Sequence, residues 1–162
     1  MESVMISIQP RWCELIANRK KTVEVRKARP KLGEPFKVYI YCTKSKKEFL
    51  QSRNNVKFYC EDKDFIGGHG VGWYIRLNGT VIGEFICDGI TKIRADNMVQ
   101  AYYNNTEETC LNDVEIKRYA NGCPLYYWHI SNLVIYDKPK ELSEFGLKRP
   151  PQSWCYVKEL TK

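Results

Sequence analysis

The pattern of apolar and polar residues changes its period twice within residues 5–26. Residues 5–8 are mainly apolar, and Pro10 then opens a segment whose apolar side chains recur at helical spacing. Proline suits the first turn of a helix because that turn needs no N–H donor. Residues 22–26 alternate strictly between polar and apolar side chains, which is typical of a half-buried strand. The pattern predicts a strand, a short helix and a second strand, with a polar turn at residues 18–21.

Runs of β-branched and aromatic residues predict further strands along the rest of the chain. These runs lie at residues 36–43, 73–77, 80–87, 90–93, 125–136 and 150–157. The dipeptide Asn78-Gly79 separates two of the runs, and this dipeptide is favoured in two-residue hairpin turns. We therefore expect residues 71–87 to form a β-hairpin.

Short helices are expected between these strands, each after a residue that favours a helix N-terminus. Ser45, Asp96 and Asn112 are the candidate caps, for helices that end near Leu50, Tyr103 and Ala120. Asn112 and Glu115 also have the spacing of a capping box, in which each side chain bonds to the backbone of the other residue. Short helices among many strands indicate the α+β class.

The length and charge of the chain narrow its organisation and its partners. Its 162 residues fit a single domain, residues 1–162, with a Gly-rich insertion at about 52–72. The formal net charge of +7 favours anionic partners such as nucleic acid, nucleotides or an acidic membrane surface. The sequence has no run of 18 or more apolar residues, so we expect no membrane span.

The seven cysteines are scattered along the chain, and no two have the Cys-x-x-Cys spacing of a zinc ribbon or redox motif. An odd number of cysteines without a signal-peptide pattern predicts reduced thiols and a cytoplasmic protein. The sequence therefore predicts no metal site and no cofactor.

Residues 10–27 resemble the signature of ASCH domains, the activating-signal-cointegrator homology family. In this signature a helix ends in a Gly-Lys-Lys-Thr-x-Glu-x-Arg-like turn that leads into a strand, and this chain has Lys20-Lys-Thr-Val-Glu-Val-Arg26. Asn18-Arg19 stands where glycine is common, so one of these two residues is expected in the left-handed conformation. The resemblance implies a PUA-like β-barrel with short helices packed around it, and a cleft beside this turn.

The resemblance also implies that the cleft holds RNA or a nucleotide-like ligand, since ASCH relatives are similar to PUA and YTH domains. Lysine and arginine would donate to phosphate or carbonyl oxygens, and an indole would stack on a base. The candidate ligand-binding residues are Trp12, Lys20, Lys21, Thr22, Glu24, Arg26, His129 and Trp154. On the pattern alone, a solvated strand face, buried indoles and a structural histidine are alternatives for the same residues.

Two other functions stay open. Some ASCH-like proteins are amidohydrolases on N4-acylated cytidine that use a Lys, a Thr and a Glu, and others are ribonucleases. Lys21 and Glu24 are the catalytic candidates here, although Glu24 stands where the amidohydrolase scheme has its Thr nucleophile. Glu107 or Glu108 is a candidate third carboxylate, and His129 would suit phosphodiester cleavage. The last alternative is a protein-interaction module that uses the Gly-rich insertion and exposed aromatic residues. The sequence does not define an oligomeric state.

Overall fold

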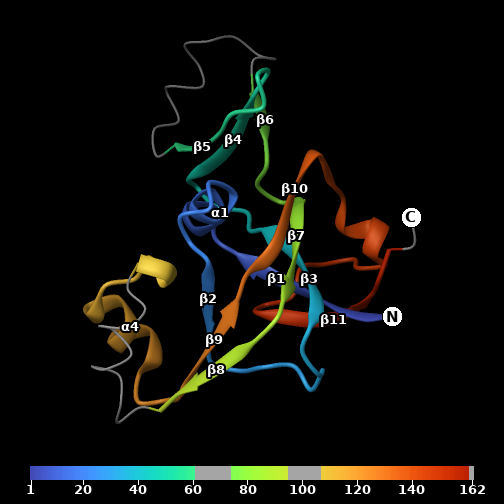
Figure 1. Ribbon diagram of the computed structural model, residues 1–162. Coiled ribbons are helices and arrows are strands. Elements are labelled where there is room, and N and C mark those ends of the chain that lie inside the picture. Colours follow the sequence, from blue (N-terminus) through green and yellow to red (C-terminus); the bar gives the residue numbers. More distant parts are fainter. Residues whose placement is uncertain (61–73, 95–106, 161–162) are drawn as a thin grey trace.

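Residues 1–60, 74–94 and 107–160 are described by the structure, which is a computed structural model (Figure 1). Its strands are β1 (Glu2–Ile8), β2 (Val23–Arg26), β3 (Phe36–Cys42), β4 (Glu48–Ser52), β5 (Lys57–Cys60), β6 (Tyr74–Arg76), β7 (Val81–Cys87), β8 (Ile90–Ile93), β9 (Leu125–His129), β10 (Ser131–Lys140) and β11 (Trp154–Lys158). Its helices are α1 (Pro10–Ala17), α4 (Asp113–Ala120) and the 3-10 helix η2 (Leu142–Phe145).

The largest sheet has five strands in the order β10-β7-β3-β1-β11. β1 pairs in parallel with β3, and the other neighbouring strands pair antiparallel. Both faces of the central strands are covered, because Val4 and Val38 belong to one apolar cluster whereas Met5 and Tyr39 belong to another. This double burial explains why residues 4–6 of β1, and all of β3 except Lys37, are apolar and do not alternate with polar residues.

A second, antiparallel sheet has the order β2-β9-β8 and carries the charged residues of the N-terminal motif. Val23 and Val25 of β2 join the apolar cluster that includes buried residues of α4. Because side chains alternate along a strand, Glu24 and Arg26 point to the opposite face. The strand and the alternation predicted for residues 22–26 are therefore confirmed.

The third sheet, in the order β5-β4-β6, extends beyond α1 at one end of the molecule (Figure 1). It shows that the prediction of a helix between Ser45 and Leu50 is wrong. Phe49 and Leu50 are buried in β4, and Phe49 joins the main apolar cluster. Burial of these side chains outweighs the weak capping signal of a serine.

The hairpin predicted for residues 71–87 is also wrong. β6 pairs with β4, whereas β7 pairs with β3 and β10 in the largest sheet. The Asn78-Gly79 dipeptide instead forms a corner between two sheets. There the Asn78 amide accepts a hydrogen bond from Phe49 N at 2.8 Å and donates one to Lys47 O at 2.9 Å. β7 buries its apolar side chains between two partner strands, which an isolated hairpin could not do.

Several other predicted elements are confirmed. α1 begins at Pro10, and the capping box of Asn112 and Glu115 starts α4 with both of its hydrogen bonds formed. The predicted C-terminal strand returns antiparallel to β1 as β11. The helix predicted after Asp96 and the glycines at residues 67–72 lie outside the described residues.

The described strand pairings do not close a barrel. β10 and β11 lie at opposite edges of the five-stranded sheet, and the pairings among the described residues give three separate sheets. The α+β class is confirmed, whereas the closed PUA-like barrel stays a prediction. Within the three described ranges, no helix is long and apolar enough to cross a membrane.

Gly83 of β7 lies where the backbone of β10 approaches closely. A Cβ at this position would collide with the carbonyl oxygen of Val134 and would lie 3.0 Å from Ile135 Cδ1. We expect Gly83→Ala to lower the free energy of unfolding by about 1–3 kcal/mol, because overpacking displaces β10. Gly33→Ala is the control, since nothing lies within 4 Å of a Cβ there. Equal urea midpoints for the two variants would contradict this close approach.

Candidate functional site

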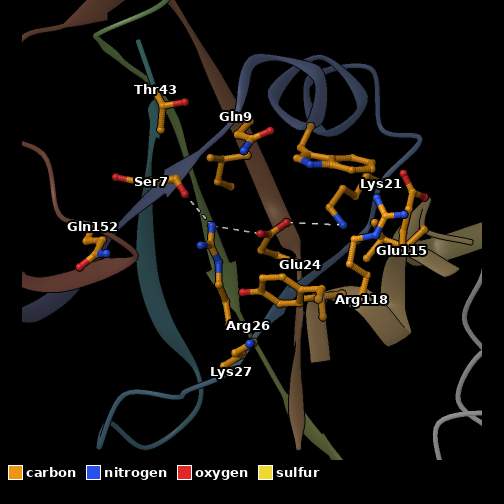
Figure 2. Close-up of a pocket in the computed structure, with 15 residues that line it drawn as sticks. Ser7, Gln9, Lys21, Glu24, Arg26, Lys27, Thr43, Glu115, Arg118 and Gln152 are labelled. Carbon is orange, nitrogen blue, oxygen red and sulfur yellow. Dashed lines mark hydrogen bonds and ion pairs between the residues drawn. The ribbon is translucent and has the colours of Figure 1, made fainter. Parts of the chain in front are cut away.

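A cavity of about 660 Å³ opens between α1, β2 and α4 (Figure 2). Ser7 at the end of β1 and Gln152 in the loop before β11 complete its border. The cavity lies beside the basic turn that follows α1, where the resemblance to ASCH domains implied a cleft.

The turn after α1 directs one of its two lysines into the cavity. Arg19 adopts the left-handed conformation with a φ of 58°, so an arginine takes the place that glycine commonly has in the ASCH signature. The backbone N–H groups of Lys20 and Lys21 both donate to Leu15 O, at 2.9 and 3.1 Å, and so close the end of α1. As a result Lys21 is only 2 % exposed, whereas Lys20 faces solvent.

Lys21, Glu24 and Arg26 form a charged cluster on the cavity wall, in which Lys21 and Glu24 are buried and Arg26 is mostly buried (Figure 2). Glu24 Oε2 lies 3.5 Å from Lys21 Nζ, and Glu24 Oε1 lies 3.1 Å from Arg26 Nη2. Each cation also binds a backbone carbonyl: Lys21 Nζ donates to Thr109 O at 2.7 Å, and Arg26 Nη2 donates to Ser7 O at 2.6 Å. Lys21 and Arg26 share one carboxylate, so the cluster has a surplus positive charge beside the cavity whenever Lys21 is protonated.

Burial lowers the pKa of the Lys21 ammonium from its ordinary value, and the nearby Glu24 carboxylate opposes part of this decrease. The folded state therefore disfavours the charged form of this lysine. The resulting loss of stability is present below the folded pKa and is relieved as the pH rises toward the pKa of the unfolded lysine. A lysine with a lowered pKa also releases its proton more readily than an exposed lysine does.

Arg26 has a buried donor atom, Nε, and the Tyr119 hydroxyl interacts with the same guanidinium. Its Nε has no hydrogen-bond partner, although the same guanidinium binds Ser7 and Glu24 through Nη2. A buried donor without a partner is uncommon in folded proteins and costs free energy.

The structure brings four of the predicted site residues to this cavity: Trp12, Lys21, Glu24 and Arg26. The Trp12 ring lies beside Lys21, with Nζ 5.4 Å from the ring centroid. Lys21 and Glu24, the catalytic candidates, are therefore in contact with each other at the cavity wall.

The other four predicted site residues, Lys20, Thr22, His129 and Trp154, do not line the cavity. Lys20, Thr22 and His129 are exposed to solvent elsewhere on the surface. The Trp154 ring packs on the main apolar cluster, with its centroid 6.1 Å from that of Trp128. Apolar burial against the core thus sets the position of Trp154, and the loop residue Gln152 borders the cavity instead.

Sequence reasoning missed the contribution of α4. Glu115, Arg118 and Tyr119 of this helix line the cavity, whereas Glu107 and Glu108, the candidates for a third carboxylate, are exposed and do not line it. Glu115 and Arg118 are three residues apart and so share a helix face, but only the long-range packing of α4 on β2 shows that this face meets the cavity. Across the described residues, no group of three or more His, Cys, Asp or Glu side chains could hold a metal ion.

Comparison with solved structures identifies the fold. The ASCH protein of Zymomonas mobilis is 18% identical over 97% of this chain and 88% of that protein, with a TM-score of 0.66. A Tyr-to-Phe mutant of it aligns at 17% identity over 97% and 91% of the two chains, with a TM-score of 0.66. A Ser-to-Ala mutant aligns at 18% identity over 97% and 89%, with a TM-score of 0.59. No family model and no curated protein matches the sequence. The chain therefore has the fold of these ASCH proteins, as its N-terminal motif predicted.

Glu24 is the only carboxylate that Lys21 and Arg26 contact among the described residues. We expect Glu24→Gln to lower the free energy of unfolding by about 3–5 kcal/mol, because it leaves the buried Lys21 and the mostly buried Arg26 without a counter-charge. Glu144→Gln, which breaks the exposed Lys140–Glu144 pair at 3.7 Å, should cost less than about 1 kcal/mol. Chemical denaturation measures both values, and a loss below 1 kcal/mol for Glu24→Gln would show that the cluster is effectively solvated.

Proposed function

We propose that this ASCH-fold chain binds a nucleotide-like ligand, either free or as an unstacked nucleotide of RNA, in the cavity beside Lys21. The observation that carries the proposal is the buried cluster in which Lys21 and Arg26 share the single carboxylate of Glu24. A surplus of buried positive charge is costly unless an anionic or strongly polar partner compensates it. A ligand that brings acceptor oxygens would provide that compensation.

The size and the walls of the cavity fit a nucleotide. Its volume of about 660 Å³ lies within the range of about 300–1,000 Å³ that is typical of small-molecule sites. Trp12 from α1 and Tyr119 from α4 both line it and offer ring surfaces for stacking. Stacking of a base on an aromatic side chain contributes on the order of 1–3 kcal/mol.

The polar groups of the wall offer both kinds of hydrogen bond that a base edge requires. Arg26 Nε is a donor without a partner, and the Glu24 carboxylate is an acceptor. Burial raises the pKa of the Tyr119 phenol, so this hydroxyl stays protonated at neutral pH. Such a mixed set of donors and acceptors is what readout of an unpaired base uses.

Binding of the common ribonucleoside 5′-monophosphates, and of short single-stranded RNA, tests this function by isothermal titration calorimetry. We expect binding by the native chain and a loss of affinity of at least about tenfold in Arg26→Gln, since a charge-assisted hydrogen bond contributes about 1.5–3 kcal/mol. Arg149→Gln is the matched control, because Arg149 is exposed and does not line the cavity.

Arg26→Lys separates a binding effect from a folding defect. It keeps the positive charge beside Glu24 but removes the Nε–H donor. It should fold like the native chain, which circular dichroism checks, and it should still bind more weakly. Unchanged affinity in both Arg26 variants, or no binding of any nucleotide or RNA to the native chain, would contradict the proposal.

A hydrolase is the second candidate, and the contact between Lys21 and Glu24 is the observation that favours it. Burial lowers the pKa of Lys21, and its ammonium lies 3.5 Å from a carboxylate inside a cavity, which suits proton transfer. The nucleophile of the amidohydrolase scheme is not at the Glu24 position, and Thr22 is exposed outside the cavity. Thr43 is a hydroxyl residue that lines it.

Incubation with N4-acetylcytidine and with short RNA tests the hydrolase candidate by chromatography of the products. Hydrolysis of the acyl amide would give cytidine and acetate, and Lys21→Met should abolish it because the variant cannot transfer a proton. Lys117→Met, at an exposed lysine outside the cavity, is the control. If the native chain gives no product from either substrate, the hydrolase candidate fails and the binding proposal remains.

A further inference from the structure

The charged wall of the cavity presents its hydrogen-bonding groups in a fixed order. Lys21 lies at the end of the turn that follows α1, and Glu24 and Arg26 share one face of β2. Glu24 Oε2 lies 3.5 Å from Lys21 Nζ, and Glu24 Oε1 lies 3.1 Å from Arg26 Nη2. Figure 2 shows the carboxylate between the two cations. Across the wall the order is therefore donor, acceptor, donor.

Each of these three groups borders the cavity and keeps capacity for a further hydrogen bond. A carboxylate offers about four acceptor positions, and each oxygen of Glu24 is engaged by one cation. Lys21 Nζ donates to Thr109 O at 2.7 Å and lies beside Glu24, which leaves one N–H of the protonated amine. Arg26 Nη2 donates to Ser7 O, whereas its Nε has no hydrogen-bond partner among the described residues.

The four common bases differ in the pattern of their Watson–Crick edges, which is what readout of an unpaired base uses. Uracil has an N–H between two carbonyl oxygens, so its edge complements all three groups of the wall. Guanine has one carbonyl oxygen, and its amino group would face the second cation. Cytosine and adenine place an unprotonated ring nitrogen at the centre of this edge, opposite the carboxylate. Adenine has acceptors on both sides of its amino group, but they lie on two different edges of the base.

We infer that the wall of Lys21, Glu24 and Arg26 reads the imide edge of uracil, so that the nucleotide bound in the cavity is a uridine nucleotide. This inference rests on the proposed function, because it names the base of the same ligand. Glu24 accepts the N3–H of uracil, and Lys21 and Arg26 each donate to one carbonyl oxygen. Lys21 and Glu24 are buried, so a base that leaves either unmatched loses affinity without compensation from water.

Calorimetry with the four common ribonucleoside 5′-monophosphates tests the identity of the base. We expect uridine monophosphate to bind the native chain at least about tenfold more tightly than each of the other three, because only uracil matches every group of the wall. The cavity volume of about 660 Å³ admits purines and pyrimidines alike, so size alone does not predict this preference.

Two methylated uridines locate the contact on the base without any change to the protein. In 3-methyluridine a methyl group replaces the N3–H that Glu24 accepts, and we expect binding at least about tenfold weaker than that of uridine. The matched control is 5-methyluridine, which carries the same methyl group away from the Watson–Crick edge. It should bind within about threefold of uridine.

Glu24→Gln tests the wall itself. A glutamine amide can turn its NH₂ donor toward the ring nitrogen of cytosine, so the preference for uridine over cytidine monophosphate should fall at least about tenfold. Glu144→Gln is the matched control, because it makes the same change at an exposed residue of η2 outside the cavity lining. Circular dichroism checks that Glu24→Gln is folded. If it is not, the methylated uridines with the native chain still decide.

Three results would overturn the readout of uracil while the proposed function stands. The first is equal binding of the four monophosphates. The second is an equal loss of affinity for 3-methyluridine and 5-methyluridine, which would indicate only a steric limit. The third is a preference for guanosine monophosphate, which fits a neutral Lys21 whose lone pair faces the amino group. If the native chain binds no nucleoside and no monophosphate, the proposed function and the readout of uracil both fail.

Discussion

The shared carboxylate of Glu24 is the interaction on which the cavity depends. Through Lys21 it fixes the turn that leaves α1, and through Arg26 it fixes the end of β1, because Arg26 also binds Ser7 O. Lys21 extends the same network to Thr109 O, far away along the chain. The Glu24 carboxylate thus links three separate segments of the chain that border the cavity. A cluster held by charge can border an open cavity, whereas apolar side chains would close over it.

The two helices beside the cavity are joined by a second carboxylate with two roles. Glu115 completes the capping box of α4, and its other oxygen pairs with Arg11 of α1 at 3.6 Å. This contact between the helices that supply Trp12 and Tyr119 is largely exposed, so it adds at most about 1 kcal/mol to the order of the cavity walls.

The sequence predictions are accurate where a feature depends on neighbouring residues, and they fail where it depends on packing between distant segments of the chain. The alternation of residues 22–26 and the capping box of Asn112 are local, and the structure confirms both. Asn78-Gly79 also has a strong local preference, but the burial of β7 between β3 and β10 outweighs it. In the site, the motif at Lys21 could be found in the sequence, whereas the face of α4 could not. Its approach to β2 depends on apolar packing between segments that are distant along the chain.

The most direct test of the central claim is a crystal structure of the chain with a bound ribonucleoside monophosphate. The account predicts an acceptor atom of the base within about 2.7–3.2 Å of a nitrogen of the Arg26 guanidinium, whose Nε has no hydrogen-bond partner among the described residues. The salt bridges of Glu24 to Lys21 and Arg26 should persist, because they form the preordered wall. A nucleotide bound at another surface, with Arg26 Nε still unpaired, would contradict the account.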